Sequence, residues 1–281
     1  MKTAIVTDST AVVDKEFVKS NPNVYIVPLH LMIKDHDYAD GVDLTQEMFF
    51  QMMDQSSIIP TTSQPSVGEI LELFEMLKSK YDQILYITIS SKISGTYSTG
   101  KLAMNQIEGI EIEVFDSLHT SAIQLMFVKE AVRLASKGKT IHEIVSILEI
   151  LREKAAIYLI VDDLKHLART GRVNNVSAII GTLLKIKPIL KFEDGYINLH
   201  KKVRSLSKAY QDVIEIAKAE QLNCSSLIMV AHANSHQNAV KIRDMLKKIY
   251  PNHDIEICEL SPVISVHTGP NSVGVAWLKK V

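Results

Sequence analysis

The sequence predicts an α/β protein in which a parallel sheet is flanked by helices. Short apolar runs of strand length recur along the chain, and longer amphipathic segments separate them. In the first half of the chain the strand-like runs are Thr3–Val6, Val24–Pro28, Ile84–Ile89 and Ile110–Phe115. Because parallel strands need a crossover connection that is usually a helix, this alternation indicates parallel pairing.

The amphipathic segments between and after these strands predict helices. Ile70, Leu71, Phe74 and Leu77, for example, fall on one face at helical spacing. The last segment opens with Thr140 and has a Glu three residues later, the pattern of a capping box. The predicted helices are Gln46–Gln55, Val67–Lys80, Ser94–Ile107, Thr120–Lys137 and Thr140–Lys154.

After about Ala155 the pattern starts again. It predicts a hairpin around Glu193-Asp194-Gly195 and a long helix that ends near Ala219. The other predicted elements are strand Ile157–Val161, helix Val176–Leu184, hairpin strands Ile189–Phe192 and Tyr196–His200, strand Leu227–Ala231, helix Gln237–Tyr250, and strands Ile255–Glu259 and Gly274–Leu278. We expect an N-terminal α/β domain over residues 1–155 and a mixed C-terminal α/β domain over 156–281, closely packed because no low-complexity linker separates them.

Composition argues against several functional classes. The 281 residues carry a formal net charge of −1, which does not favour binding to nucleic acid and predicts at most a transient membrane contact. The longest uncharged stretch, Leu260–Leu278, is interrupted by prolines and glycines, so we do not expect it to span a membrane. Cys224 and Cys258 lack a second ligand at metal spacing. They predict two buried, reduced thiols in a cytoplasmic protein without metal or cofactor.

A loop dense in hydroxyl groups follows the strand that ends near residue 89. Within it, Gly95–Lys101 matches the first seven positions of a phosphate-binding P-loop. Leu102 stands where that motif needs a hydroxyl to bind Mg²⁺. Leu102 also continues an apolar helical face with Ile93 and Ile107, which predicts an ordinary helix entry. Such an entry can still hold an anion through its N–H groups and hydroxyls.

Two further segments have the chemistry of a carboxyl-binding site. Thr61-Thr62-Ser63-Gln64-Pro65-Ser66 carries four hydroxyls before a predicted helix, whereas a helix cap needs only one. The surplus suits an anionic or carboxyl ligand. His267 follows an apolar strand-like run and is expected in a loop with Ser265 and Thr268, where a structural role and a role in a site are equally compatible with the sequence.

Other polar segments leave alternatives open. Asp8-Ser9-Thr10 lacks the second Asp of an aspartyl-phosphate enzyme, so we interpret it as a cap for a helix near Asp14 or as the border of a ligand site. The His and Asp residues between positions 30 and 43 are interpreted as a solvated turn, in a region without flanking strands, and not as a metal site. Arg169–Arg172 is expected to be exposed, as a solvated turn or as a contact for a phosphorylated partner.

Taken together, these segments resemble the DegV family, which includes fatty-acid-binding subunits of bacterial fatty acid kinase. Each motif is short, and their number and order carry the resemblance over nearly the whole chain. The motifs are Ile5-Val6-Thr7-Asp8-Ser9-Thr10, Asp40-Gly41, Thr61-Thr62-Ser63-Gln64-Pro65-Ser66, Ser90-Ser91-Lys92-Ile93-Ser94-Gly95-Thr96-Tyr97, Asp116-Ser117, Gly171-Arg172, Lys187-Pro188-Ile189-Leu190 and His267-Thr268-Gly269-Pro270.

The resemblance implies a long-chain fatty acid, such as palmitate, stearate or oleate, enclosed between two domains. It also implies a separate ATP-dependent kinase subunit that phosphorylates the fatty acid carboxyl for phospholipid synthesis, and it assigns the chain no catalysis of its own. The carboxyl-binding residues it implies are Thr62, Ser63, Ser94, Gly95, Thr96, His267 and Thr268. Arg172 and Arg204 are the positions it implies for contact with the kinase.

The chain departs from the family pattern at two places. Asn271 stands where glycine is common after Gly-Pro, and the segment Leu118–Gln124 lacks a glycine that is frequent there. An enzyme is the alternative to a binding protein: a P-loop-like phosphotransferase, or a serine hydrolase acting on acyl esters through Ser94 with His267 and Asp116. Leu102 argues against the first, and the absence of a G-x-S-x-G motif argues against the second.

Overall fold

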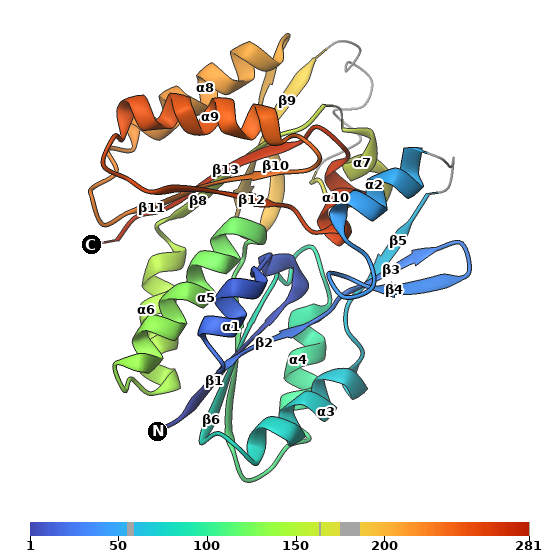
Figure 1. Cartoon of the computed structure of the whole chain (residues 1–281), viewed down its shortest axis with the longest axis vertical. Coiled ribbons are helices and arrows are strands. Elements are labelled where there is room, and N and C mark those ends of the chain that lie inside the picture. Colours follow the sequence, from blue (N-terminus) through green and yellow to red (C-terminus); the bar gives the residue numbers. More distant parts are fainter. Residues whose placement is uncertain (55–58, 163, 175–185, 281) are drawn as a thin grey trace.

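The protein has the predicted α/β fold, with two main sheets and a small third one (Figure 1). The computed structural model describes residues 1–54, 59–162, 164–174 and 186–280. The predicted helix Val176–Leu184 therefore lies outside the described residues. Within the described residues, no helix is long and apolar enough to cross a membrane.

The N-terminal sheet is parallel throughout, as predicted, with strand order β2-β1-β6-β7. Its strands are β1 (Thr3–Asp8), β2 (Val24–Val27), β6 (Gln83–Thr88) and β7 (Glu111–Asp116). One face packs against α3 (Val67–Lys78) and α4 (Thr96–Met104), and the other against α5 (Ser121–Ser136) and α6 (Ile141–Arg152). Because helices cover both faces, β1 and β6 are buried along their whole length.

The C-terminal sheet is mixed, with strand order β10-β9-β8-β13-β11-β12. Only β11 and β12 pair in parallel, and β9 with β10 forms the predicted hairpin. Its strands are β8 (Ala155–Ile160), β9 (Lys187–Glu193), β10 (Tyr196–Val203), β11 (Leu227–His232), β12 (Ile255–Glu259) and β13 (Val273–Leu278). Helices α8 (Leu206–Ala219) and α9 (His236–Ile249) cover its outer face (Figure 1).

Helix α5 lies between the two main sheets and contacts strands of both (Figure 1). Its first turns are buried on every side, including the polar Gln124. The largest apolar cluster therefore runs through both halves, from Ile5 in β1 to Leu278 in β13. The two sheets meet around one shared core, which fits close packing of the halves, while their division near residue 155 into two domains stays a prediction.

Several short elements that lie outside the two main sheets were not predicted. One is the three-stranded sheet formed by β3, β4 and β5, which lies beside α10 at one end of the molecule. These elements are the 3-10 turn η1 (Ser9–Ala11), β3 (His30–Ile33), β4 (His36–Ala39), β5 (Thr61–Ser63), α7 (Lys165–Thr170) and α10 (Pro262–Thr268). The helix expected near Asp14 is α1 (Lys15–Ser20). Helix α2 (Gln46–Asp54) was predicted.

Four local expectations are corrected by the structure. The side chain of Leu102 is 56% exposed and does not continue a buried apolar face. The polar region after residue 30 is a hairpin of β3 and β4. His30 Nδ1 lies 3.2 Å from Asp37 Oδ1 in this hairpin, and His30 Nε2 lies 2.8 Å from Glu69 Oε1 in α3. Asp8 caps η1, whereas α1 has its own cap in Asp14. No group of three potential metal ligands occurs in the described part of the chain. Cys224 is exposed, so the expectation of two buried thiols is wrong at that position.

Candidate functional site

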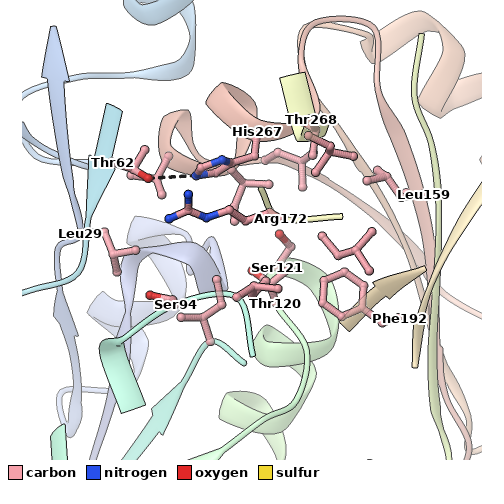
Figure 2. Close-up of a pocket in the computed structure, with 18 of the residues that line it drawn as sticks. Leu29, Thr62, Ser94, Thr120, Ser121, Leu159, Arg172, Phe192, His267 and Thr268 are labelled. Carbon is pink, nitrogen blue, oxygen red and sulfur yellow. Dashed lines mark hydrogen bonds between the residues drawn. The ribbon is translucent and has the colours of Figure 1, made fainter. Parts of the chain in front are cut away.

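An elongated pocket lies between the N-terminal and C-terminal sheets, and both halves of the chain line it (Figure 2). It encloses about 800 Å³ of unfilled space, including the part open to solvent, which is within the ~300–1,000 Å³ of small-molecule sites. A ligand in this space would contact side chains from both halves of the chain.

One end of the pocket is apolar and closed. Its wall is formed by side chains of strands β8, β9, β10 and β11. These are Ile157, Leu159, Phe192, Ile197 and Ala231, and none of them is more than 6% exposed. Gly274 of β13 lies among them, paired with Leu159 on one side and Ala231 on the other. This end can bury an apolar chain without offering it a hydrogen bond.

The other end of the pocket is polar and includes Thr62 and His267. Thr62 sits in β5 and His267 in the last turn of α10, and Thr62 Oγ1 lies 2.9 Å from His267 Nε2 (Figure 2). The expectation that His267 lies in a loop is wrong. Ser261 and Pro262 begin a short helix, in which Ser261 Oγ accepts a hydrogen bond from the N–H of Ile264.

His267 is held in its neutral form. Burial lowers the pKa of His267 to about 3, and the positive charge of Arg172 lowers it further in the same direction. Among the described residues, Nδ1 of His267 has no hydrogen-bond partner. A neutral imidazole can donate to or accept from a ligand oxygen, depending on its tautomer.

Ser94 lies in the loop between β6 and α4, and its hydroxyl borders the polar end (Figure 2). Ser94 Oγ is 2.9 Å from Thr96 Oγ1 and accepts a hydrogen bond from the N–H of Thr96. Thr96 itself is buried behind Ser94 and does not line the pocket. Gly95 lines it, and a Cβ at Gly95 would lie 2.9 Å from Gln64 Nε2, so glycine leaves room for that side chain.

Ser63 and Thr268, the remaining predicted residues, also line the pocket. Ser63 is exposed and Thr268 is buried, with its hydroxyl 3.4 Å from the carbonyl of Gly269. Gln64, which lies next to Ser63, is exposed as well. The polar end of the pocket therefore reaches the surface, in contrast to the closed apolar end.

Arg172 is not the exposed residue that the sequence suggested. It is half-buried, lines the pocket, and lies in Figure 2 on the same side as Thr62, His267 and Ser94. Helix α7 is followed by Gly171, whose backbone has the left-handed conformation. This turn directs the chain inward at Arg172, and the Arg172 guanidinium donates a hydrogen bond to the carbonyl of Thr170. The pocket thus contains a cation that sequence analysis did not place there. Arg204, by contrast, is exposed just before α8.

Asp40 fixes the position of the helix that carries His267. Its buried carboxyl accepts hydrogen bonds from Ser9 Oγ at 2.7 Å and from the N–H of Val263, in the first turn of α10, at 3.3 Å. Burial raises the pKa of Asp40 to about 6. This contact joins the loop after β1, the loop after β4 and α10, so three distant segments support the polar end.

Thr120 and Ser121 also line the pocket and were not assigned to it from the sequence. In the sequence they fall within residues 118–124, the segment that departs from the family pattern, and this departure was the one indication that the segment differs. Both are buried, at 5% and 0% exposure, at the start of α5. Their position inside the pocket depends on how α5 is packed between the sheets, which no local pattern reveals.

The described residues do not form the Ser94-His267-Asp116 triad or place the P-loop-like lysine at the pocket. Asp116 Oδ1 accepts hydrogen bonds from the N–H groups of Ser91 and Leu118, and in the part of the chain that the structure describes no carboxylate contacts His267 Nδ1. A Ser-His-Asp triad needs such a contact to orient the imidazole. Lys101, the P-loop-like lysine, does not line the pocket.

Comparison with known proteins gives consistent matches over the whole chain. The family model described as "Uncharacterised protein, DegV family" matches residues 2–280. A DegV domain-containing protein of Halalkalibacterium halodurans is 38% identical over 278 residues, with 98% of each chain covered. The crystal structure of DegV, a fatty acid binding protein from Bacillus subtilis, matches with a TM-score of 0.92 and 33% identity over 100% of both chains.

A more distant structural relative is known by the ligand that it binds. The crystal structure of a stearic acid-binding protein from Eubacterium ventriosum matches with a TM-score of 0.91 at 25% identity. The match covers 99% of the present chain and 98% of that protein. The aligned part of the chain therefore includes both sheets.

Proposed function

Because the chain belongs to the DegV family, we propose that it binds a long-chain fatty acid in the pocket between its sheets. The observation that carries the proposal is the division of one pocket into a closed apolar end and a polar end. Thr62, Ser94, His267 and Arg172 hold the carboxyl group, and the strands of the C-terminal sheet enclose the alkyl chain. The ligands we expect are saturated or monounsaturated acids such as palmitate, stearate and oleate.

The energetics of burial fit such a ligand. A sixteen-carbon acid buries about fourteen methylenes, and at ~0.8 kcal/mol each the upper figure is roughly 11 kcal/mol. Lost translational and chain freedom offset a good part of this gain. The alkyl chain therefore supplies most of the affinity. The polar end has to satisfy the carboxyl group, which it does with neutral hydroxyls, a neutral imidazole and one guanidinium.

The hydroxyls of Ser63 and Thr268, with Gly95, complete the polar end around the carboxyl group. Thr96 contributes through Ser94, whose hydroxyl it contacts. Ser63 and Gln64 are exposed, so this end of the pocket is open to a partner protein. The apolar chain, in contrast, is shielded from water.

We further propose that the chain presents the carboxyl group to a separate ATP-dependent kinase, which forms an acyl phosphate for phospholipid synthesis. In this scheme the chain works in the cytoplasm as a carrier and has no catalysis of its own. Arg172 neutralises the carboxylate and the growing phosphoryl charge, and the exposed Arg204 contacts the kinase. The exposure of the polar end, with Arg172 beside it, supports this part of the proposal.

Native mass spectrometry of protein purified under non-denaturing conditions tests the binding proposal. We expect one equivalent of fatty acid to remain bound, and its mass identifies the chain length. Protein that is free of ligand and takes up neither palmitate nor oleate contradicts the proposal. ATP turnover or ester hydrolysis by the isolated protein, abolished by Lys101→Ala or Ser94→Ala respectively, supports an enzyme instead.

The kinase step is tested separately with fatty-acid-loaded protein, a candidate kinase subunit and ATP. Hydroxylamine traps an acyl phosphate as a hydroxamate that can be quantified. We expect Arg204→Ala to reduce hydroxamate formation and to leave fatty acid loading unchanged. Equal hydroxamate formation by the parent and Arg204→Ala removes Arg204 from the kinase contact.

A further inference from the structure

Two hydroxyl groups inside the pocket lack any hydrogen-bond partner among the described residues. They are Thr120 Oγ1 and Ser121 Oγ, on side chains that are 5% and 0% exposed. Both residues line the pocket that we assign to the fatty acid. Buried hydroxyls are normally paired, so two neighbouring exceptions in one cavity call for a partner that is absent from the protein itself.

These hydroxyls do not serve the helix that they begin. Thr120 is the N-cap of α5, yet its side chain makes no capping hydrogen bond. The equivalent residues of α3 and α6, Ser66 and Thr140, both bond to the N–H three residues later and complete capping boxes. Ser121 has a φ of +50°, a conformation that is unfavourable for a residue with a Cβ. The strained backbone and the unused cap therefore both occur in residues that line the pocket.

The two hydroxyls lie part-way along the pocket. In Figure 2 they stand between the polar end, marked by Ser94 and Arg172, and the apolar side chains of Leu159 and Phe192. A simple alkyl chain that passes this point has no group to pair with them. It leaves both hydroxyls unsatisfied or retains a water molecule beside the chain.

We propose that the pocket contains a second polar subsite, in which Thr120 and Ser121 bind an oxygen substituent on the acyl chain. The substituent is a hydroxyl or a carbonyl group, because a Ser or Thr hydroxyl can donate to either and can also accept from a hydroxyl. The preferred ligand is then a hydroxy or oxo fatty acid. This inference rests on the proposed function, because it takes the carboxyl group to lie at the polar end.

The test compares dissociation constants for stearate and for its 9-, 10- and 12-hydroxy derivatives, measured by displacement of a fluorescent fatty acid. At least one hydroxystearate is expected to bind about tenfold more tightly than stearate, since it pairs hydroxyls that stearate leaves unpaired. In Thr120→Val, which keeps the side-chain shape and removes the hydroxyl, the ratio of the two constants falls towards one. Ser136→Ala removes an exposed hydroxyl from the same helix and should keep the parent ratio.

Ser121 needs two variants because of its backbone conformation. Ser121→Ala removes the hydroxyl and keeps the strain, whereas Ser121→Gly removes both, so at least one variant should remain folded. Both are expected to lower the preference for the hydroxystearate. If stearate binds and no hydroxystearate binds more tightly, or if the preference survives in the Thr120 and Ser121 variants, the subsite is refuted while the fatty acid proposal stands. If neither class of acid binds, both proposals fail.

Discussion

The two ends of the pocket are built from different kinds of structure. The polar end collects Thr62, Ser94, Arg172 and His267 from a short edge strand, a loop, the end of a short helix and the last turn of another. The apolar end consists of neighbouring positions on paired strands, where Gly274 has Leu159 and Ala231 beside it. One end is thus an assembly of element ends, and the other is part of a continuous sheet.

This difference suggests a division of roles. Positions in a sheet are fixed by many backbone hydrogen bonds, so the apolar end sets the shape of the cavity and the length of chain that it accepts. The residues of the polar end occupy loops and helix ends, which can carry chemistry and admit a partner. We therefore expect changes at the apolar end to alter affinity and chain length most strongly. Changes at the polar end should alter the handling of the carboxyl group.

The largest effect is expected from filling the apolar end. Gly274 has no unusual backbone conformation, and a Cβ built there lies 3.8 Å from Ala231 and 3.9 Å from Leu159, so a side chain has room at its base. Gly274→Leu places four carbons in the cavity and displaces several ligand methylenes. At ~0.8 kcal/mol per methylene, we expect palmitate to bind about a hundredfold more weakly.

Isothermal titration with fatty acids of ten to eighteen carbons measures this effect. Gly274→Ala is the graded control and should weaken palmitate binding only by a few-fold, because it adds a single methyl. Circular dichroism confirms that both variants are folded. Unchanged palmitate affinity in Gly274→Leu means that the alkyl chain does not pass β13, and the assignment of the apolar end is then wrong.

The next effect concerns the charge at the polar end. Arg172→Ala removes the one cation that the structure places among the described residues lining the pocket. A hydrogen bond to an ionised group contributes ~1.5–3 kcal/mol, so we expect fatty acid affinity to fall about tenfold or more at pH 7.5. Arg204→Ala serves as the matched control because Arg204 is exposed and away from the pocket lining. Equal affinities for the two variants assign Arg172 a role in partner contact alone.

His267 gives the polar end a pH dependence that the apolar end lacks. Its pKa is about 3 in the folded protein and near the usual 6.5 when unfolded, so the unfolded chain takes up the proton first on acidification. The stability linked to neutral His267 is present above pH 6.5 and is lost as the pH falls towards 3. Between pH 7.5 and pH 5, this loss is expected to be about 1–2 kcal/mol.

Chemical denaturation of the parent and His267→Gln at both pH values isolates this contribution. Glutamine can keep a hydrogen bond to Thr62 and does not titrate. Asp40, whose pKa burial raises to about 6, acts in the opposite direction as the pH falls, but it is present in both proteins and cancels in the difference. A parent that loses no more stability than His267→Gln shows that the imidazole is not buried as described.

The smallest effect is expected at Ser94. Removing its neutral hydroxyl in Ser94→Ala takes one hydrogen bond from the carboxyl group and one from Thr96, so fatty acid affinity should fall about three- to tenfold. The exposed Ser98, in the first turn of the same α4, provides the matched control Ser98→Ala, with no expected change. If both substitutions are silent, the carboxyl group is bound elsewhere.

The apolar framework could be predicted from the sequence because its strands are continuous apolar runs and its helices carry apolar residues at a regular helical spacing. Strands β1, β6 and β11 and helices α3, α6 and α8 appear within a few residues of their predicted bounds. The capping box predicted at Thr140, before α6, is present, and the structure has a second one at Ser66, before α3. Short elements outside the two main sheets, such as β5 and α10, were missed. Their stability comes from contacts with distant segments, as between Asp40 and the start of α10.

The pocket could be predicted only in part, for a similar reason. The hydroxyls of Thr62, Ser63 and Ser94 stood out because their segments carry more hydroxyls than a helix cap uses. Arg172 was misplaced, since a basic residue after a helix is usually exposed and its inward direction depends on the turn at Gly171. Thr120 and Ser121 became visible only when the unpaired atoms in the folded chain were known.

The contrast between the two ends is tested most directly by ¹³C NMR of bound palmitate labelled at its carboxyl carbon or at its terminal methyl. Each label is observed in the parent, in Arg172→Ala and in Gly274→Ala. The carboxyl resonance should move more in Arg172→Ala, and the methyl resonance should move more in Gly274→Ala. The reverse pattern, or no bound resonance in the parent protein, contradicts the orientation of the fatty acid that we derive from the pocket.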